Sequence, residues 1–271
     1  MTELSPEKYL ELIGDWQDPN PAPVIELHNN IHVVRDDLLQ YGSKLRFVDY
    51  FIGHAPENKE VEEWVFGSCP ATGYAQISLP VVCKRYGKKA VLFMAERSMD
   101  KLHPYQQRGI ELGTEYHWVK MGMLNVTQAH AKKYTAEDPI HRRVLPLGLE
   151  HETVLASIIR VCLIRVARNL PVKPKEIWSV GSSGTMNRGL QLAFPDAEVH
   201  VVQVGHTMKE REIGRAIHHI SPYKFDKPVK IHEMPPFPSA PTYDAKAWQP
   251  MIDWYKTNEK KGDVLFWNVA F

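Results

Sequence analysis

The first segment able to do covalent chemistry ends at a lysine. An apolar run, Ile31–Val34, leads through Arg35-Asp36-Asp37 and a Gly42-Ser43 turn to Lys44, where a helix is expected to begin. A lysine that is partly desolvated has a lowered pKa and becomes a nucleophilic amine. Lys44 is therefore a candidate for holding an aldehyde cofactor as a Schiff base. The alternative is a solvated surface charge, the commonest state of a lysine beside a turn.

A second segment has the composition of an anion-binding turn. The apolar run Ile177–Val180 is followed by Gly181-Ser182-Ser183-Gly184-Thr185 and then by a helical pattern over Met186–Phe194. Backbone N–H groups and the helix dipole converge at such a turn and favour an anion. The P-loop lysine and the Gly-x-Gly-x-x-Gly spacing are both absent, so a small phosphate ester fits better than a nucleotide. A tight strand-to-helix turn that binds nothing is the alternative.

Two further segments place polar residues at the start of a helix. Thr72-Gly73-Tyr74 opens a helical pattern over Gly73–Tyr86 and could bind a substrate carboxylate, or Thr72 could simply cap the helix. Near the end of the chain, Tyr243 and Asp244 stand side by side. Tyr243 is a candidate general acid or base, and Asp244 is a candidate partner for a protonated ring nitrogen. A buried core tyrosine and a helix-capping aspartate are the alternatives.

The elements that must position these residues alternate between strand and helix. Apolar runs typical of strands lie at Ile31–Val34, Ala90–Ala95, Tyr116–Val119, Ile177–Val180, Val199–Val204 and Val264–Val269. Helical patterns lie at Gly73–Tyr86, Glu150–Asn169 and Met186–Phe194. This alternation predicts an α/β fold with a mainly parallel sheet.

Composition excludes several classes of protein. The 271 residues carry a formal net charge of +1, so no global basic field calls for nucleic acid. Three widely spaced cysteines form neither a disulfide framework nor a metal motif, and the His218-His219 pair lacks a recognised ligand spacing, so no metal site is expected. An acidic amino-terminal segment and the lack of a long apolar run predict a cytoplasmic protein with no membrane partner.

In this order, the segments resemble motifs of the fold-type II pyridoxal phosphate (PLP) enzymes, the tryptophan-synthase-β-like family. The most similar branch contains 1-aminocyclopropane-1-carboxylate (ACC) deaminase and D-cysteine desulfhydrase. Val34–Asp37 and Gly42-Ser43-Lys44 resemble the segment that carries the family's Schiff-base lysine, and 181–185 resembles its phosphate loop. Tyr243–Ala247 resembles the deaminase stretch Tyr-Glu-Gly-Lys-Ser, and Asn268 begins the segment similar to its His-x-Gly-Gly motif.

The resemblance implies two three-layer α/β/α domains with mainly parallel sheets and PLP between them. Residues 1–52 and 160–271 would form the larger, PLP-binding domain, and 53–159 the smaller one. Lys44, 181–185, Asp244 and Asn268 would bind the cofactor, and Thr72-Gly73-Tyr74 the substrate. Family members usually dimerise, so a homodimer is expected.

Three functions are considered. The first is an enzyme that generates a Cα carbanion from an amino-acid Schiff base, as in a deaminase, lyase or decarboxylase. The second rests on Gly73-Tyr74 and Asn268–Phe271, which depart from the family's Ser-Asn and His-x-Gly-Gly motifs. In these two motifs the chain resembles reduced phage proteins that tailor an amino acid, such as a glycyl group, attached to thymine in DNA. Lys132-Lys133, 141–143 and 224–230 would then contact phosphates, and the protein would act in the host cytoplasm. The third is a non-catalytic PLP-binding protein.

Overall fold

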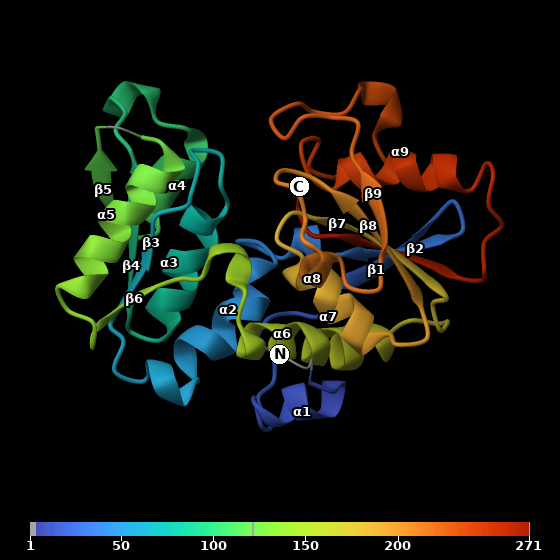
Figure 1. Ribbon diagram of the computed structural model, residues 1–271, viewed down its shortest axis with the longest axis horizontal. Helices are drawn as coiled ribbons and strands as arrows, with labels where there is room; N and C mark the ends of the chain where they lie inside the picture. Colours follow the sequence, from blue (N-terminus) through green and yellow to red (C-terminus); the bar gives the residue numbers. More distant parts are fainter. Residues whose placement is uncertain (1–3, 121, 271) are drawn as a thin grey trace. The chain divides into compact units, whose positions relative to one another are not determined.

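The computed structural model describes residues 4–120 and 122–270 and divides into two compact units (Figure 1). The first unit combines the described residues of 1–46 and 150–271, and the second covers those of 47–149. The predicted domain boundaries, at 52/53 and 159/160, lie inside helices α2 (Lys44–Gly53) and α6 (Glu152–Val161). The assignment of a larger cofactor-binding domain and a smaller one stays a prediction.

The first unit is built on a six-stranded sheet in the order β1-β2-β10-β7-β8-β9. Its strands are β1 (Val24–His28), β2 (Ile31–Arg35), β7 (Glu176–Gly181), β8 (Glu198–Gln203), β9 (Ile217–Ile220) and β10 (Val264–Asn268). Only the hairpin of β1 and β2 is antiparallel, and the other neighbours run parallel. Parallel strands end at the same edge, so β2, β7 and β10 deliver their following loops to one place.

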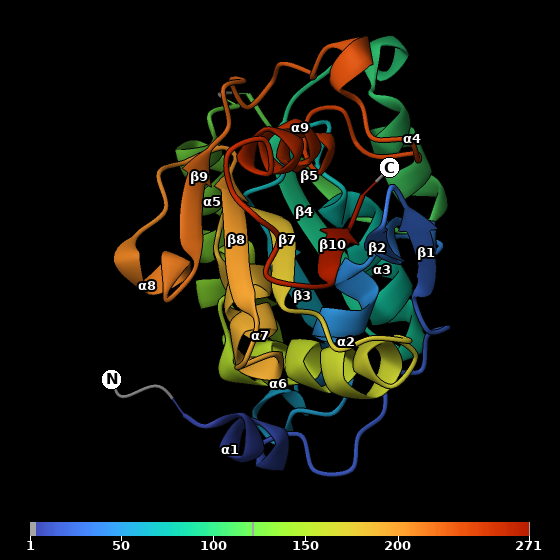
Figure 2. The same ribbon diagram turned by 90° about the vertical axis from the view of Figure 1, so that its right-hand side faces the viewer.

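Helices cover both faces of this sheet (Figure 2). Helices α6 and α7 (Thr185–Ala193) lie on one face, and α9 (Ala245–Trp254) lies on the other. Trp178 and Phe266 on the sheet share a buried core with Trp248 and Met251 of α9. The two remaining α-helices of the unit are α1 (Pro6–Glu11) and α8 (Glu210–Ile213). Two packed faces explain why the central strands β7, β8 and β10 are almost continuously buried.

The second unit has a four-stranded parallel sheet in the order β5-β4-β3-β6. The strands are β3 (Glu63–Phe66), β4 (Lys89–Ala95), β5 (Glu115–Val119) and β6 (Arg142–Val144). Helix α5 (Leu124–Ala136) packs on one face, where Val65, Val91 and Phe93 meet Ala131. Side chains alternate between the two faces of a strand, so Trp64 lies on the face opposite to Val65. There it contacts Phe51 of α2. Helices α3 (Ala75–Arg85) and α4 (Pro104–Glu111) pack against each other, and α3 also contacts β4.

The six expected strands all form, and α3 and α7 occupy the expected helical segments. The pattern over Glu150–Asn169 divides into α6 and a π-helical turn, Cys162–Ala167. Strands β1, β3, β6 and β9 were not expected. None of the described helices has the length and apolar character needed to cross a membrane.

Candidate active site

Lys44 is the first residue of α2 and follows a tight turn. Gly42 has a left-handed φ of 88°, which a glycine adopts without steric strain. The residue before it, Tyr41, also has a left-handed φ, of 71°. The Lys44 side chain is exposed. Burial raises the pKa of Asp244, and the positive charge of Lys44 opposes this rise. Two of the predicted catalytic residues therefore lie within electrostatic reach of each other in the first unit.

A buried ion network, which the sequence analysis missed, fixes the start of α2. The guanidinium of Arg46 donates to Asp36 Oδ1 at 2.7 Å and to Asp18 Oδ2 at 2.6 Å. All three side chains are almost completely buried. Removing one partner from such a network leaves a buried charge uncompensated, at a cost of about 3–5 kcal/mol. The network therefore holds the first turn of α2, and with it Lys44, against the end of β2.

The predicted phosphate loop joins β7 to α7. Gly184 has φ 77° and occupies the N-cap position, so the cap residue has no side chain to occupy the first N–H groups of α7. A Cβ at Gly184 would lie 2.6 Å from Glu212 Cβ, which shows how closely α8 packs on the loop. Asn187 holds α8 in place by donating to the carbonyl of Glu212 at 2.7 Å. The turn is thus held in a fixed conformation at a helix N-terminus, where backbone N–H groups favour an anion such as a phosphate group.

Gly184→Ala is expected to destabilise the protein and to weaken cofactor binding. The left-handed φ costs a non-glycine residue about 1–2 kcal/mol, and the forced contact with Glu212 adds about 1–3 kcal/mol. Chemical denaturation and PLP titration measure the two effects. Gly14→Ala is the matched control, because Gly14 also has a positive φ, of 51°, but open space around a Cβ. Equal losses in both variants would contradict the close packing at Gly184.

Asp244 stands immediately before α9 and is 1% exposed. Its side chain makes no capping hydrogen bond to the described residues of the helix, so the structure does not use it as a cap. Oδ1 instead accepts the Val269 N–H at 3.2 Å, at the end of β10. Oδ2 is buried and has no hydrogen-bond partner among the described residues. A buried carboxyl oxygen of this kind needs a donor or a proton.

Burial raises the pKa of Asp244 to about 8. The negative charge of Asp37 adds to this rise, whereas the N–H groups of Val269 and Ala270 and the charge of Lys44 oppose it. The carboxyl group thus keeps a proton near neutral pH. A group of this kind, with one oxygen lacking a partner, fits the ring nitrogen of a pyridine cofactor.

Tyr243 connects the phosphate loop to Asp244. Burial raises the pKa of Tyr243 to about 12, and the neighbouring Asp244 adds to the rise. A hydrogen bond from the Ser182 side chain opposes it. Because Ser182 belongs to the loop, the structure places the loop beside Tyr243 and Asp244. The predicted roles of these residues in cofactor binding and catalysis stay predictions.

Asn268 has a different environment from the one implied by the family motif. Its amide oxygen accepts the Ser239 hydroxyl at 2.6 Å, and its amide nitrogen donates to the Pro238 carbonyl at 3.1 Å. The side chain is completely buried and ties the 238–239 loop to β10. This geometry indicates a structural role, and the predicted contact with the cofactor stays a prediction. Phe271, the last residue of that motif, lies outside the described residues.

Thr72-Gly73-Tyr74 belongs to the second unit and precedes α3. Tyr74, not Thr72, occupies the N-cap position of that helix. Gly73 lies so close to Cys69 that a Cβ would be 2.7 Å from the Sγ atom, which explains a glycine there. The Tyr74 ring packs edge-on against Tyr105 at a centroid distance of 5.3 Å. The predicted contact of this segment with substrate stays a prediction.

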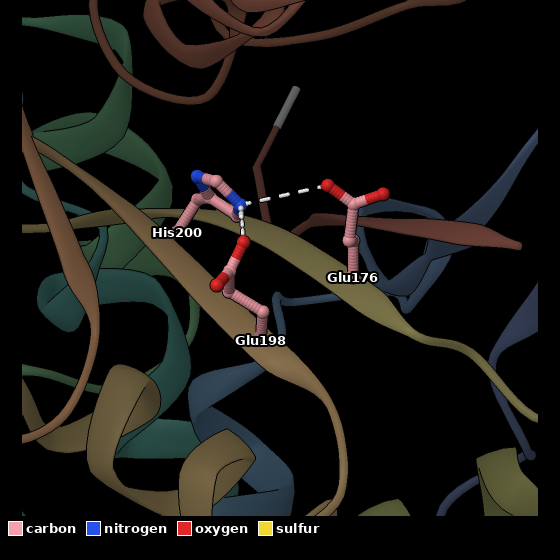
Figure 3. A group of neighbouring side chains, drawn as sticks. All are labelled: Glu176, Glu198 and His200. Carbon is pink, nitrogen blue, oxygen red and sulfur yellow. Dashed lines mark ion pairs between the residues drawn. The ribbon is translucent and has the colours of Figure 1, made fainter. Parts of the chain in front are cut away.

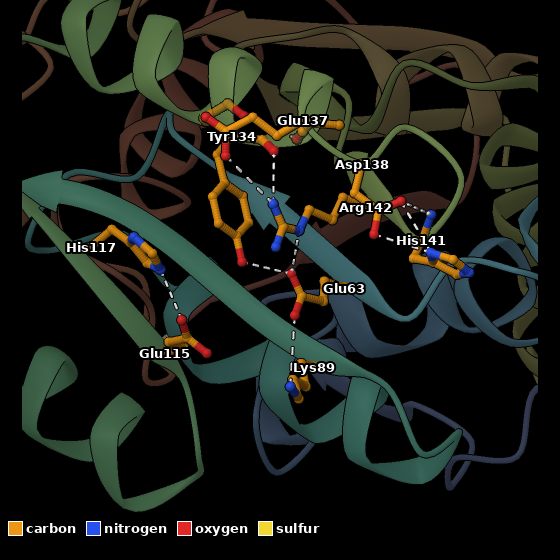
Figure 4. Close-up of polar contacts among 11 residues, drawn as sticks. Glu63, Lys89, Glu115, His117, Tyr134, Glu137, Asp138, His141 and Arg142 are labelled. Carbon is orange, nitrogen blue, oxygen red and sulfur yellow. Dashed lines mark hydrogen bonds and ion pairs between the residues drawn. The ribbon is translucent and has the colours of Figure 1, made fainter.

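Several of the basic residues considered as phosphate contacts are paired within the second unit (Figure 4). Arg142 donates to Glu63 at 2.9 Å and lies 3.8 Å from the centre of the Tyr134 ring. His141 lies 3.0 Å from a carboxylate oxygen of Asp138. These ion pairs show that both residues already have acidic partners within the protein, as charged side chains at a protein surface often do.

Comparison with solved structures identifies the class to which this fold belongs. The chain is similar to an ACC deaminase homologue, with a TM-score of 0.76 and 17% identity, over 99% of this chain and 95% of the other. For threonine deaminase isoform 2 of Solanum lycopersicum, the TM-score is 0.72 and the identity 12%, with 98% and 89% coverage. For the O-acetylserine-dependent cystathionine β-synthase of Helicobacter pylori, the TM-score is 0.62 and the identity 14%, over 100% of this chain and 96% of the other. The fold is that of the fold-type II PLP enzymes, which confirms the predicted fold class and resemblance.

One curated protein is similar in sequence: the glycyl-dTMP PLP-dependent decarboxylase of Pseudomonas phage M6. It is 24% identical over 214 residues, which span 70% of this chain and 75% of the phage protein. No family model matches the chain. The predicted enzyme class and cofactor agree with these neighbours.

Proposed function

We propose that this protein is a PLP-dependent enzyme that breaks a bond at Cα of an amino-acid substrate, as a deaminase, lyase or decarboxylase. The observation that carries the proposal is the buried Asp244 carboxyl group. Its Oδ2 atom lacks a partner among the described residues, and its pKa is raised to about 8, in a fold whose solved examples bind PLP. A buried carboxyl oxygen without a hydrogen-bond partner costs stability, and a pyridine nitrogen at this position would offset that cost.

Each residue of the site has a defined task in this proposal. Lys44 Nζ would hold the cofactor through its aldehyde group, and the same amine would move a proton to or from the substrate Cα. The 181–185 loop binds the phosphate through backbone N–H groups and hydroxyls. Asp244 keeps a proton beside the ring nitrogen, and the Tyr243 hydroxyl is a second acid or base. When bound, PLP supplies the electron sink for the charge that develops at Cα.

A second candidate function is the tailoring of an amino acid carried on thymidylate. The observation that favours it is the similarity to the phage glycyl-dTMP decarboxylase over most of both chains. In this proposal the substrate is a glycyl group on thymine, and DNA is its carrier. The acidic residue at Asp244 fits a reaction that needs strong stabilisation of a carbanion, as loss of carbon dioxide from a glycyl group does.

Mass spectrometry separates the two candidates. The PLP-loaded protein is incubated with free amino acids and, separately, with glycyl-dTMP and with DNA that contains glycyl-thymine. Loss of carbon dioxide from a thymidylate substrate, without turnover of free amino acids, supports the second candidate. Turnover of free amino acids alone contradicts the second candidate and supports the first.

The non-catalytic alternative has its own outcome in the same experiment. A protein of that kind acquires the visible absorbance of bound PLP. Adding an amine does not change this absorbance, and the amine itself loses no mass. A protein that acquires no absorbance with PLP contradicts the whole proposal.

A further inference from the structure

A buried histidine lies between two carboxylates at the start of β7 and β8 (Figure 3). His200 is 0% exposed and Glu176 is 1% exposed, whereas the side chain of Glu198 is 27% exposed. His200 Nε2 lies 3.8 Å from Glu176 Oε1 and 3.4 Å from Glu198 Oε1. In the sheet, Glu176 pairs with Glu198, so both acidic residues begin neighbouring parallel strands. Gly181, where the phosphate loop begins, is at the opposite end of β7.

The imidazole nitrogen that faces the carboxylates has no hydrogen-bond partner among the residues that the structure describes. The other ring nitrogen, Nδ1, lies 3.0 Å from His219 Nε2. In the tautomer whose Nδ1–H donates to His219, Nε2 directs a lone pair at the two carboxylates, an arrangement that a bound cation stabilises.

The two distances from His200 approach those between neighbouring ligands of a tetrahedral metal ion. Bonds of about 2.0–2.1 Å to nitrogen and oxygen place neighbouring ligands roughly 3.3–3.4 Å apart. The separation from His200 to Glu198 has this value, the one to Glu176 is a few tenths of an ångström wider, and all three ligand atoms lie within 4.8 Å of one another. An imidazole ligand favours zinc and similar transition metals over magnesium or calcium. Two carboxylates and a neutral histidine also balance the charge of a dication.

The remaining carboxylate oxygens already have partners that orient them. Lys261 donates its backbone N–H to Glu176 Oε2 at 2.7 Å, and its ammonium donates to Glu198 Oε2 at 2.5 Å. The Tyr255 hydroxyl also hydrogen-bonds to Glu176, and the ring of Trp178 stacks on His200 at a centroid distance of 4.1 Å. Such outer contacts are what hold metal ligands in place.

We propose that Glu176, Glu198 and His200 bind a divalent transition-metal ion of the zinc type. The site does not depend on the proposed function, because it lies at the other end of β7 from the phosphate loop. Its effect is structural: the ion joins the starts of β7 and β8 and, through Lys261, the segment that precedes β10. The sequence analysis expected no metal site, because it considered the cysteines and the His218-His219 pair. The ligands proposed here come from two strands with α7 between them, so no short spacing reveals them.

The test is a titration of chelator-treated protein with Zn²⁺ and, for its visible absorbance, with Co²⁺. Wild-type protein is expected to bind one equivalent and to gain roughly 5–10 °C in Tm at a hundredfold excess over Kd. His200→Gln and Glu198→Gln are each expected to weaken binding at least tenfold. Glu198 is partly exposed, so that variant keeps the test valid when a buried substitution prevents folding. His232→Gln, at an exposed histidine, is the matched control and is expected to bind as wild type does.

Absence of stoichiometric binding by the wild-type protein would overturn the proposal. Undiminished binding by the His200 and Glu198 variants, or an equal loss in the His232 control, would overturn it as well. All measurements are made without PLP, so a failed PLP titration bears on the proposed function and leaves this test unaffected.

Discussion

Lys44→Ala is expected to lower turnover by about a thousandfold or more, because it removes both the group that holds the cofactor and the group that moves a proton at Cα. PLP is still expected to bind through the 181–185 loop, without a covalent link. The measurements are steady-state kinetics and the visible absorbance of the lysine-linked cofactor. Borohydride reduction followed by peptide mass spectrometry locates the linkage.

Lys173→Ala provides the control for Lys44. Lys173 is an exposed lysine that pairs with Asp196, so its removal is expected to change neither turnover nor absorbance. A Lys44→Ala protein that still yields the reduced cofactor–lysine linkage would show that another lysine performs this role.

Asp244→Asn is expected to lower turnover by about 10²–10³-fold, while PLP binding changes much less. An amide cannot keep the ring nitrogen protonated, so charge at Cα is less well delocalised, whereas the phosphate loop still supplies most of the affinity. Kinetic constants and PLP titration measure the two effects separately. Asp253→Asn, at an exposed residue of the same helix α9, is the control. An unchanged rate in Asp244→Asn would exclude the proposed role.

The cofactor-free protein offers an independent readout of Asp244. Burial raises its pKa from the ordinary value of 3.8 to about 8, so the folded state keeps a proton that the unfolded state releases between these values. The free energy of unfolding therefore falls as the pH rises from about 4 to 8, by up to about 1.4 kcal/mol per pH unit from this group. Denaturation of the Asp244→Asn variant is expected to show a weaker dependence. Identical profiles would mean that the carboxyl is ionised in the folded protein.

The parts of the site that the sequence predicted are those with a local signal. Lys44 follows a strand and a glycine turn, and 181–185 joins a strand to a helix, so the local pattern is enough to predict both positions. Strands such as β6 (Arg142–Val144) and β9 (Ile217–Ile220) are short and rich in basic residues or histidine. Their conformation depends on pairing with β3 and β8, which periodicity along one segment does not reveal.

The parts that the sequence did not predict depend on contacts between distant segments. Asp18, Asp36 and Arg46 form a buried network although each is a residue type that usually lies at the surface. Asn268 was expected to contact cofactor because of its place in a motif. The structure shows its amide bonded to Ser239 and Pro238, residues that only the fold brings near the end of β10.

The packing of α8 against Gly184 also bears on how the cofactor binds. A loop that is already held by Glu212 and Asn187 loses little conformational entropy when a phosphate arrives, so most of the interaction energy is available as affinity. Association with PLP should then proceed in one kinetic phase, without a slow ordering step. Substitutions in α8 that loosen this packing should lower affinity mainly by making the empty loop heterogeneous.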